Sequence, residues 1–215
     1  MASSPQTSRA RLVALPSPTL AQADDATLAR AAGSGDPRAT SVLWDRFSPL
    51  VRRMLRRTLG PHAHVDDLLQ QVFLRALGQL SGGGIDTTQL RPLVVGAAVR
   101  VLAAELRRHR VRRLFRLRSP WHVADAAYPA SDATTRTALS SLYRILDELD
   151  ADARLAFTLK HFEGLQVTEL ASAMEASLQS AKRHLARANS RVLAAVRNDG
   201  ALSSYATAVS LGDTP

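Results

Sequence analysis

The stretch that decides the fold lies within residues 164–197 and reads Gly164-Leu165-Gln166-Val167-Thr168-Glu169-Leu170-Ala171, then Met174-Glu175-Ala176-Ser177-Leu178, then Lys182-Arg183-His184-Leu185-Ala186-Arg187-Ala188. This pattern predicts two short helices joined by a tight turn. The second helix is expected to carry apolar residues on one face and cations on the other. Two helices arranged in this way are typical of a helix-turn-helix unit.

The second helix of this unit has a regular apolar side. Its apolar residues recur at steps of three and four, as on one face of a helix with about 3.6 residues per turn. These residues are Ala181, Leu185, Ala188, Val192 and Ala195. The first helix has Leu170, Ala171 and Met174 on its apolar side, and the small Ala171 permits a close helix crossing.

Every charged residue on the polar side of the second helix is a cation, since no acid lies between Ser177 and Arg197, and amide and hydroxyl groups lie near its start. The members of this polar side are Gln179, Ser180, Arg183, Arg187 and Arg191. Such a face suits a groove lined by phosphates, because Arg binds phosphate or guanine while Gln and Ser contact base edges. An ordinary solvated face is the alternative, and the partner helix favours the nucleic-acid interpretation.

Composition and charge restrict the class of protein. The 215 residues exceed one typical domain, and the absence of cysteine excludes a disulfide framework, a thiolate nucleophile and a Cys-based zinc site. No apolar run approaches the roughly 18 residues that span a bilayer, and no signal peptide is recognisable. We therefore expect a soluble, cytoplasmic protein without a membrane partner.

The charge is unevenly distributed along the chain. The 28 cations and 19 acids give a net charge of +9, which implies a polyanionic partner, nucleic acid before membrane. Residues 26–118 hold 17 Arg against 6 acids, whereas 136–199 hold 9 cations against 8 acids. The second segment is nearly neutral, with all of its acids except Asp199 before Ala176 and its cations mostly after it.

The predicted fold class is all-α, with two small helical domains joined by a flexible linker and the helix-turn-helix in the second. We expect a disordered lead over 1–25, a first domain over 26–117, a linker over 118–133, a second domain over 134–199 and a disordered tail over 200–215. Helices are predicted over 27–32, 37–59, 66–80, 93–113, 134–149, 152–162, 167–174 and 178–197, with Asp36 as an N-cap and Pro37 in the first turn.

Two motifs together resemble the extracytoplasmic-function group of bacterial RNA polymerase sigma factors. Val65-Asp66-Asp67-Leu68-Leu69-Gln70-Gln71-Val72-Phe73-Leu74-Arg75-Ala76 is similar to that family's Asp-Leu-Val-Gln-Glu-Val-Phe-Leu-Arg-Ala core. Phe162-Glu163-Gly164-Leu165 and the helix-turn-helix resemble its Phe-Glu-Gly-Leu-Ser and Val-Lys-Ser-Arg-Leu-x-Arg-Ala runs. Upstream, residues 43–51 look like its first core helix, so the resemblance covers about residues 26–197.

The resemblance implies that the first domain binds core RNA polymerase and the minus-ten promoter element. Asp67, Gln70, Gln71 and Arg75 lie at helical steps on one polar side, opposite a face carrying Leu68, Val72 and Leu74 to Leu77. By resemblance this strip meets the clamp helices of the polymerase large subunit; a solvated face is the alternative reading.

The resemblance also implies two DNA-binding sets. The first, for the minus-ten element, lies on the basic helix that also holds Arg112 and Arg113, and its members are Arg100, Arg107, Arg108 and Arg110. The second, for the minus-thirty-five element, is Gln179, Ser180, Lys182, Arg183 and Arg187.

The sequence departs from the family pattern in places. Leu93 stands at the family's tryptophan position, Val99-Arg100 replace its Arg-Asn pair, and Ala104 stands at its Asp position. An aromatic wedge and an amide base reader are therefore missing. Glu175 stands where the family favours glycine in the turn, and a non-glycine residue at positive φ costs on the order of 1 kcal/mol.

Catalytic groups are scattered, so we predict that the chain is not an enzyme, has no cofactor and holds no metal. His62 and His64 alternate in a loop, but no partner set completes a metal site. The expected partners are core RNA polymerase and promoter DNA, and the resemblance leaves room for an anti-sigma factor. Two alternatives stay open: a stand-alone helix-turn-helix regulator, and a sigma-like protein that binds polymerase without melting promoters.

Overall fold

The computed structural model describes residues 20–60, 64–82, 89–114, 133–200 and 202, and within these ranges the regular elements are all helical. A short 3-10 helix, η1, spans Leu20–Gln22. The α-helices are α1 (Asp25–Gly33), α2 (Pro37–Leu59), α3 (Val65–Ser81), α4 (Leu90–Leu114), α5 (Ala133–Glu148), α6 (Ala151–His161), α7 (Val167–Ala173) and α8 (Leu178–Asn198). The all-α prediction is confirmed.

Local sequence signals set the helix ends. Asp24, Asp36, Asp150 and Ser177 cap α1, α2, α6 and α8, each with its side chain accepting a hydrogen bond from a backbone N–H of the first turn. Gly60 ends α2 at φ 85°, a conformation that favours glycine. The N-cap predicted at Asp36, with Pro37 in the first turn, is therefore present.

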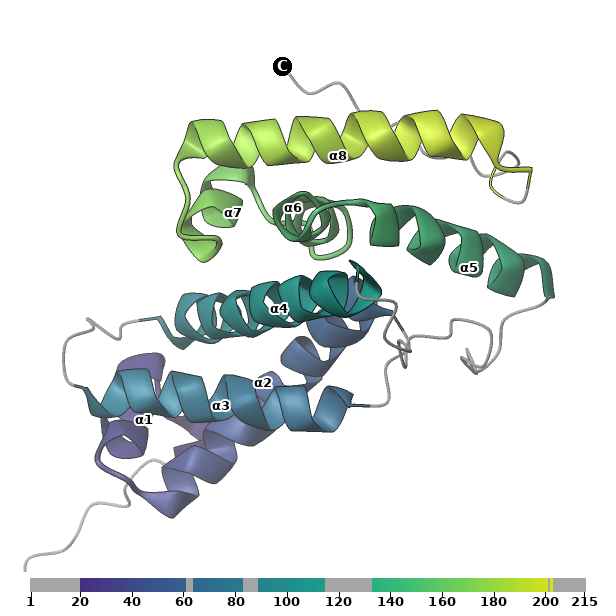
Figure 1. Cartoon of the computed structure of the whole chain (residues 1–215). Coiled ribbons are helices and arrows are strands. Elements are labelled where there is room, and N and C mark those ends of the chain that lie inside the picture. The colour runs from purple at the N-terminus through teal and green to yellow at the C-terminus, as the bar shows by residue number, and fades with distance from the viewer. Residues whose placement is uncertain (1–19, 61–63, 83–88, 115–132, 201, 203–215) are drawn as a thin grey trace, which may run out of the picture.

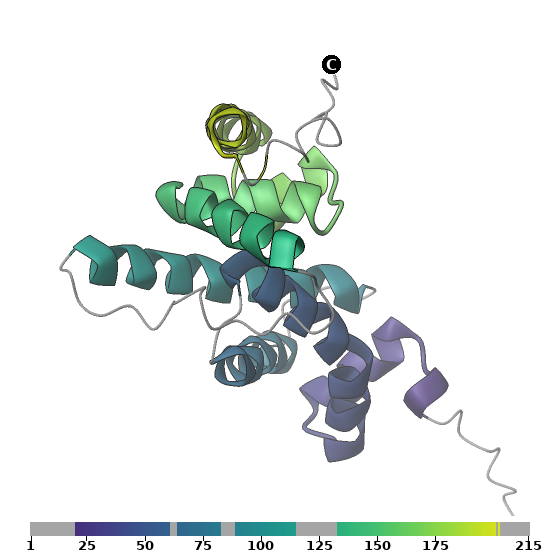
Figure 2. The same cartoon turned by 90° about the vertical axis from the view of Figure 1, so that its right-hand side faces the viewer.

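The helices form two lobes that lie one on the other. Helices α1 to α4 make the first lobe and α5 to α8 the second, with α8 crossing the outer side of the second lobe (Figure 1). Helix α4 belongs to the first lobe and lies at its boundary with the second. It packs against α2 and α3 on one side and against α6 and α7 on the other. The view along α8 shows the same layering (Figure 2).

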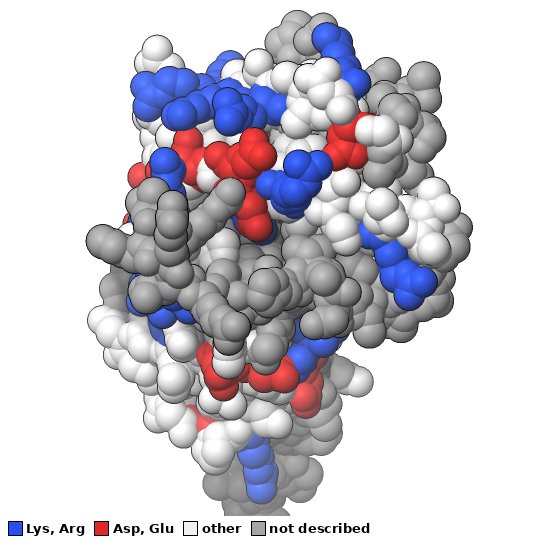
Figure 3. Space-filling view, turned by 45° about the vertical axis from the view of Figure 1, so that its right-hand side comes forward, with Lys and Arg blue, Asp and Glu red and all other residues white. Residues whose placement is uncertain are grey.

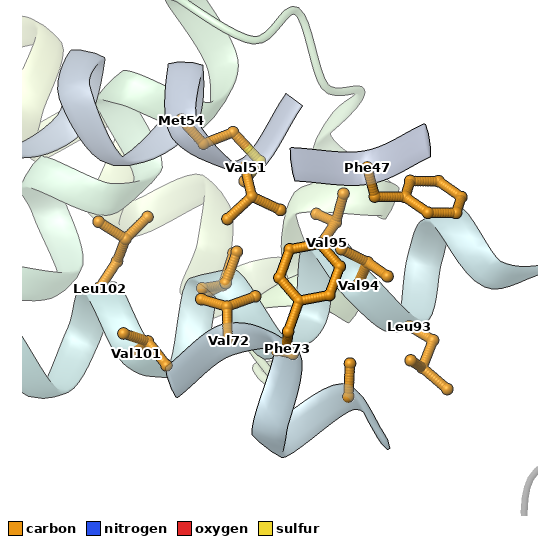
Figure 4. Close-up of a cluster of buried hydrophobic side chains, with 14 of the residues drawn as sticks. Phe47, Val51, Met54, Val72, Phe73, Leu93, Val94, Val95, Val101 and Leu102 are labelled. Atoms are coloured by element: carbon orange, nitrogen blue, oxygen red, sulfur yellow. The ribbon is translucent and has the colours of Figure 1, made fainter. Parts of the chain in front are cut away.

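The first lobe is built around side chains of α2, α3 and α4 that point toward one another (Figure 4). The labelled members are Phe47, Val51, Met54, Val72, Phe73, Leu93, Val94, Val95, Val101 and Leu102, all buried. This hydrophobic cluster continues into the second lobe through Leu155, Leu159 and Leu170. A smaller cluster links α5, α6 and α8 around Tyr143, Leu146 and Val192.

Hydrogen bonds join the end of α2 to the second lobe. The Thr58 and Thr158 hydroxyls are both buried and lie 3.2 Å apart. The Tyr143 hydroxyl donates to the carbonyl of Arg57 at 3.2 Å, and Arg154 Nε donates to the carbonyl of Thr58 at 2.9 Å. Because hydrogen bonds require particular distances and angles, these three contacts favour one placement of the second lobe on the first.

Charged side chains also meet at this interface. Arg154 is buried and forms an ion pair with Asp147; burial lowers the pKa of the Arg154 guanidinium, while the Asp147 carboxylate acts in the opposite direction. The buried Glu163 carboxylate lies 3.3 Å from Arg53 and 3.5 Å from Arg57. An acidic group of the second lobe therefore faces the strongly basic first lobe.

Some boundary predictions were wrong. Residues 20–25 are not part of a disordered lead, because η1 and the first turn of α1 occupy them and Ala23 is buried. Leu202 is buried in the smaller cluster, so the predicted disordered tail does not begin at Gly200. Helix α4 begins three residues earlier than predicted, and Asp25 accepts a hydrogen bond from its Leu90 N–H. The predicted linker falls almost wholly outside the described residues.

No helix in the described part of the chain is both long enough and apolar enough to cross a bilayer.

Candidate nucleic-acid interface

The predicted helix-turn-helix is formed by α7, a turn at Met174 to Ser177, and α8. Leu170 and Ala171 of α7 and Ala181 of α8 are buried between the two helices. Glu175 in the turn has φ 52°, the positive value expected at this position. Ser177 caps α8, its side chain accepting a hydrogen bond from the Ser180 N–H.

The two faces of α8 separate as predicted. Ala181, Ala188 and Val192 are buried, while Leu185 and Ala195 are half-buried. Four of the five residues predicted to contact the upstream element are exposed: Gln179, Lys182, Arg183 and Arg187. The fifth, Ser180, is half-buried, and its backbone N–H and its hydroxyl both lie 3.1 Å from the Ser177 hydroxyl.

The cations of this face differ in their surroundings. Arg187 lies 3.1 Å from Asp150, and Arg191 lies 3.7 Å from Glu148. Neither Lys182 nor Arg183 forms an ion pair with any residue that the structure describes. In Figure 3 basic side chains gather along the top of the molecule, where α8 runs, with acidic side chains directly beneath them.

Helix α3 presents the strip predicted to bind polymerase. Asp67, Gln70, Gln71 and Arg75 are all exposed. Leu74, predicted for the core face, is 70 % exposed and lies on this strip instead. It is two turns beyond Asp67, so helical spacing alone could have placed it there. An exposed leucine among polar groups gives the strip an apolar contact point.

The α4 arginines from Arg100 to Arg112 fall into three groups. Arg100 forms an ion pair with Glu175, and Arg107 lies 3.4 Å from Asp152, so both face the second lobe. Arg108 lies 3.3 Å from the buried Glu105, an acid of its own helix. Arg112 holds the same Glu105 at 2.7 Å. Arg110 is exposed to solvent. The predicted set is therefore not one continuous surface.

The α4 residues that depart from the family pattern are buried or half-buried in the structure. Leu93 is 9 % exposed and belongs to the hydrophobic core, so its position supplies packing rather than a surface wedge. Val99 is buried and Ala104 is half-buried. No phenylalanine, tyrosine or tryptophan lies between residues 90 and 114, and the imidazole of His109 is only 6 % exposed, so α4 presents no exposed aromatic ring on which a base could stack.

The described residues contain no group of three or more His, Asp or Glu that could hold a metal ion. His64 lies 3.6 Å from Asp67 through its Nδ1 atom, and its predicted companion His62 is outside the described ranges.

Comparisons with known proteins agree with this geometry. A family model described as "Sigma-70, region 4" matches residues 139–191, which include α6, α7 and most of α8. RNA polymerase sigma factor NccH of Alcaligenes xylosoxydans xylosoxydans is 27 % identical over 180 residues, covering 81 % of this chain and 95 % of the relative. The ECF RNA polymerase sigma-E factor of Escherichia coli K12 is 25 % identical over 179 residues, covering 80 % of this chain and 93 % of the relative.

Two solved structures share the fold. CnrH in complex with the cytosolic domain of CnrY has a TM-score of 0.57 and 22 % identity, covering 82 % of this chain and 99 % of that one. The sigma factor RpoE of Bartonella quintana, in complex with the anti-sigma factor NepR, has a TM-score of 0.54 and 19 % identity, covering 73 % of this chain and 95 % of that one.

The helical fold, the helix-turn-helix and the sigma-70 region 4 match define a sigma factor, a non-enzymatic protein of transcription initiation. Within that class, the chain is similar over about 80 % of its length to a sigma factor of the extracytoplasmic-function group.

Proposed function

We propose that this chain directs core RNA polymerase in the cytoplasm to specific promoters, with its first lobe on the polymerase and the minus-ten element and its second on the minus-thirty-five element. The observation that carries the proposal is the exposed cationic face of α8, where Lys182 and Arg183 form no ion pair with the part of the chain that the structure describes and are available to DNA. The neighbouring Gln179 adds an exposed amide that can contact a base edge.

The exposed strip on α3 supports polymerase binding by the first lobe. Burying a leucine contributes about 1.5–3 kcal/mol. Leu74 is the apolar centre of the strip, and Asp67, Gln71 and Arg75 add polar contacts around it. We also propose an anti-sigma factor as a partner of this chain, because the structurally similar RpoE is in complex with one.

Reconstitution with purified core polymerase tests the proposal. The full chain should bind the core enzyme and support initiation on a promoter selected from a randomised library. Leu74→Asp should weaken binding to polymerase at least tenfold, whereas Val111→Asp, at a 51 % exposed residue of α4, should change it less than twofold. A chain that binds duplex DNA tightly alone and never binds polymerase would instead be a stand-alone regulator.

A second candidate function follows from the absence of an exposed aromatic ring on α4. Phosphate attraction tolerates changes of side chain, whereas capture of unstacked bases depends on stacking surfaces. Under this alternative the chain binds polymerase but melts promoters poorly. Transcription from a template with an unpaired bubble at the start site would then greatly exceed transcription from the same template fully paired, whereas equal activity would support the first candidate.

A further inference from the structure

Four acids follow one another closely where α5 ends and α6 begins, and each of them meets a different arginine. They are Asp147, Glu148, Asp150 and Asp152. Two of them join other parts of the fold, because Asp147 pairs with the buried Arg154 and Asp152 lies 3.4 Å from Arg107. The other two, Glu148 and Asp150, face the cationic side of α8.

The arginines of α8 stand in one row, and these two acids meet its later members. Arg183, Arg187 and Arg191 recur at four-residue steps, so they share one side of the helix and are about 6 Å apart along its axis. Arg183 forms no ion pair with a described residue, whereas Arg187 lies 3.1 Å from Asp150 and Arg191 lies 3.7 Å from Glu148. The positive charge of the row is therefore offset over its last two members.

Asp150 is fixed in position by the helix that it caps. Its Oδ1 atom accepts a hydrogen bond from the Ala153 N–H at 2.8 Å. Its other oxygen, Oδ2, is the atom that faces Arg187. The Asp150 side chain is 21 % exposed and the Arg187 side chain is 72 % exposed, so the arginine stays open to solvent and to a competing anion.

The packing of α8 depends on its apolar side. Ala181, Ala188, Val192 and Val196 are buried there against the rest of the second lobe. Ion pairs between partly exposed side chains add little to stability. The pairs with Asp150 and Glu148 therefore change the charge that α8 presents more than they change how firmly α8 is packed. Figure 3 shows acidic side chains directly beneath the basic side chains along the top of the molecule, where α8 runs.

The start and the end of such a helix contribute differently to DNA binding. In a helix-turn-helix, the first residues of the second helix contact base edges, whereas contacts to phosphates carry no sequence information. A complex docked through base edges has one orientation, while a non-specific complex adopts the orientation that places most cations on phosphates. Acids that offset the later arginines therefore weaken non-specific binding more than specific binding.

We propose that Asp150 and Glu148 set the specificity of the helix-turn-helix by suppressing the contacts of Arg187 and Arg191 with the phosphates of non-cognate DNA. The inference rests on the proposed reading of duplex DNA by the start of α8. Both acids act through the arginines that they face, so they are positioning residues. In their absence the whole row would bind any duplex, and the distinction between sequences would shrink.

Asp150→Asn and Glu148→Gln remove the two charges, and an asparagine still offers an oxygen to the Ala153 N–H as an N-cap. The probes are a thirty-base-pair duplex of alternating adenine and thymine, and a duplex that the full chain itself enriches from a randomised library. Each change should tighten binding of the full chain to the alternating duplex about two- to fivefold at low salt. The salt slope should steepen by up to about 0.9 for each arginine released.

Binding to the enriched duplex should tighten less than twofold, so the ratio of the two affinities should fall. Asp45→Asn, which removes an exposed acid of α2 that has no ion pair with a described residue, changes the net charge equally and should move neither affinity. In an Arg187→Ala background, adding Asp150→Asn should no longer tighten binding, because the arginine through which Asp150 acts is absent.

Three results would overturn the inference: unchanged non-specific binding in both acid variants, an equal gain on both duplexes, or a gain from Asp150→Asn that persists in the Arg187→Ala background. A library from which the full chain enriches no sequence would also overturn it. These measurements need no polymerase, so they can fail while reconstituted initiation succeeds, and loss of polymerase binding would defeat the proposed function while the salt slope still reports on the acids.

Discussion

Replacing Arg183 by alanine tests the proposed reading of DNA most directly. Arg183 is exposed on α8 and forms no ion pair with a described residue, so none of those pairs has to break when DNA binds its guanidinium. Arg187, one turn further along, lies 3.1 Å from Asp150, and this ion pair must break before the Arg187 guanidinium can bind DNA. The two arginines should therefore contribute unequally, although both face outward.

The expected loss follows from this difference. A side chain that reads a base contributes about 1–3 kcal/mol of discrimination, so Arg183→Ala should weaken binding to the preferred promoter about 5- to 150-fold. Arg187→Ala should cost less, because the exposed pair with Asp150 already stabilises the free protein by about 0.2–1 kcal/mol. Arg197→Ala, in the last turn of the same helix, is the matched control and should cost less than twofold.

The assay is competition binding of the complex with core polymerase to promoter fragments that differ by single base pairs in the upstream element. Arg183→Ala should flatten the preference at one base pair and leave the others unchanged. A uniform loss on every fragment, with the salt slope reduced by about 0.9, would make Arg183 a phosphate contact and refute base reading. An unchanged affinity would show that this face of α8 does not meet DNA.

Three further predictions concern the fold. Arg154→Met leaves Asp147 without its buried partner, and because Asp147 is 19 % exposed we expect a loss of about 2–3 kcal/mol in urea unfolding, largely recovered by adding Asp147→Leu. Gly60→Ala places a β-carbon 3.2 Å from the Tyr143 ring at φ 85°, so the melting temperature should fall, whereas Gly78→Ala, with open space around it, should not lower it. Hydrogen bonds from the first turn of α1 lower the pKa of Asp24 below its ordinary value of 3.8. The ionised Asp24 carboxylate therefore stabilises the folded protein above pH 3.8, and this stabilisation is lost as the pH falls through the lowered pKa. The difference in melting temperature between Asp24→Asn and the parent chain should disappear in acid.

Helix positions followed from local signals in the sequence. The apolar spacing in 178–197 and the caps at Asp36 and Ser177 depend only on residues within a few turns, so they could be identified without the tertiary structure. The outward direction of Gln179, Lys182, Arg183 and Arg187 followed from the same periodicity. The prediction that Leu74 lies on the core face is wrong, because its angular position on α3 turns it toward solvent despite its hydrophobicity.

Contacts between distant residues could not be predicted in this way. The partners of Arg100 and Arg107 lie 75 and 45 positions further along the chain, and no local pattern in α4 indicates which acids will meet it. The core role of Leu93 likewise depends on how α2, α3 and α4 pack. Periodicity therefore determined the helices, their exposed faces and the family resemblance, because these depend on neighbours along the chain. The packing of one lobe on the other decided which cations meet solvent and which meet acids, because an ion pair depends on distance in space.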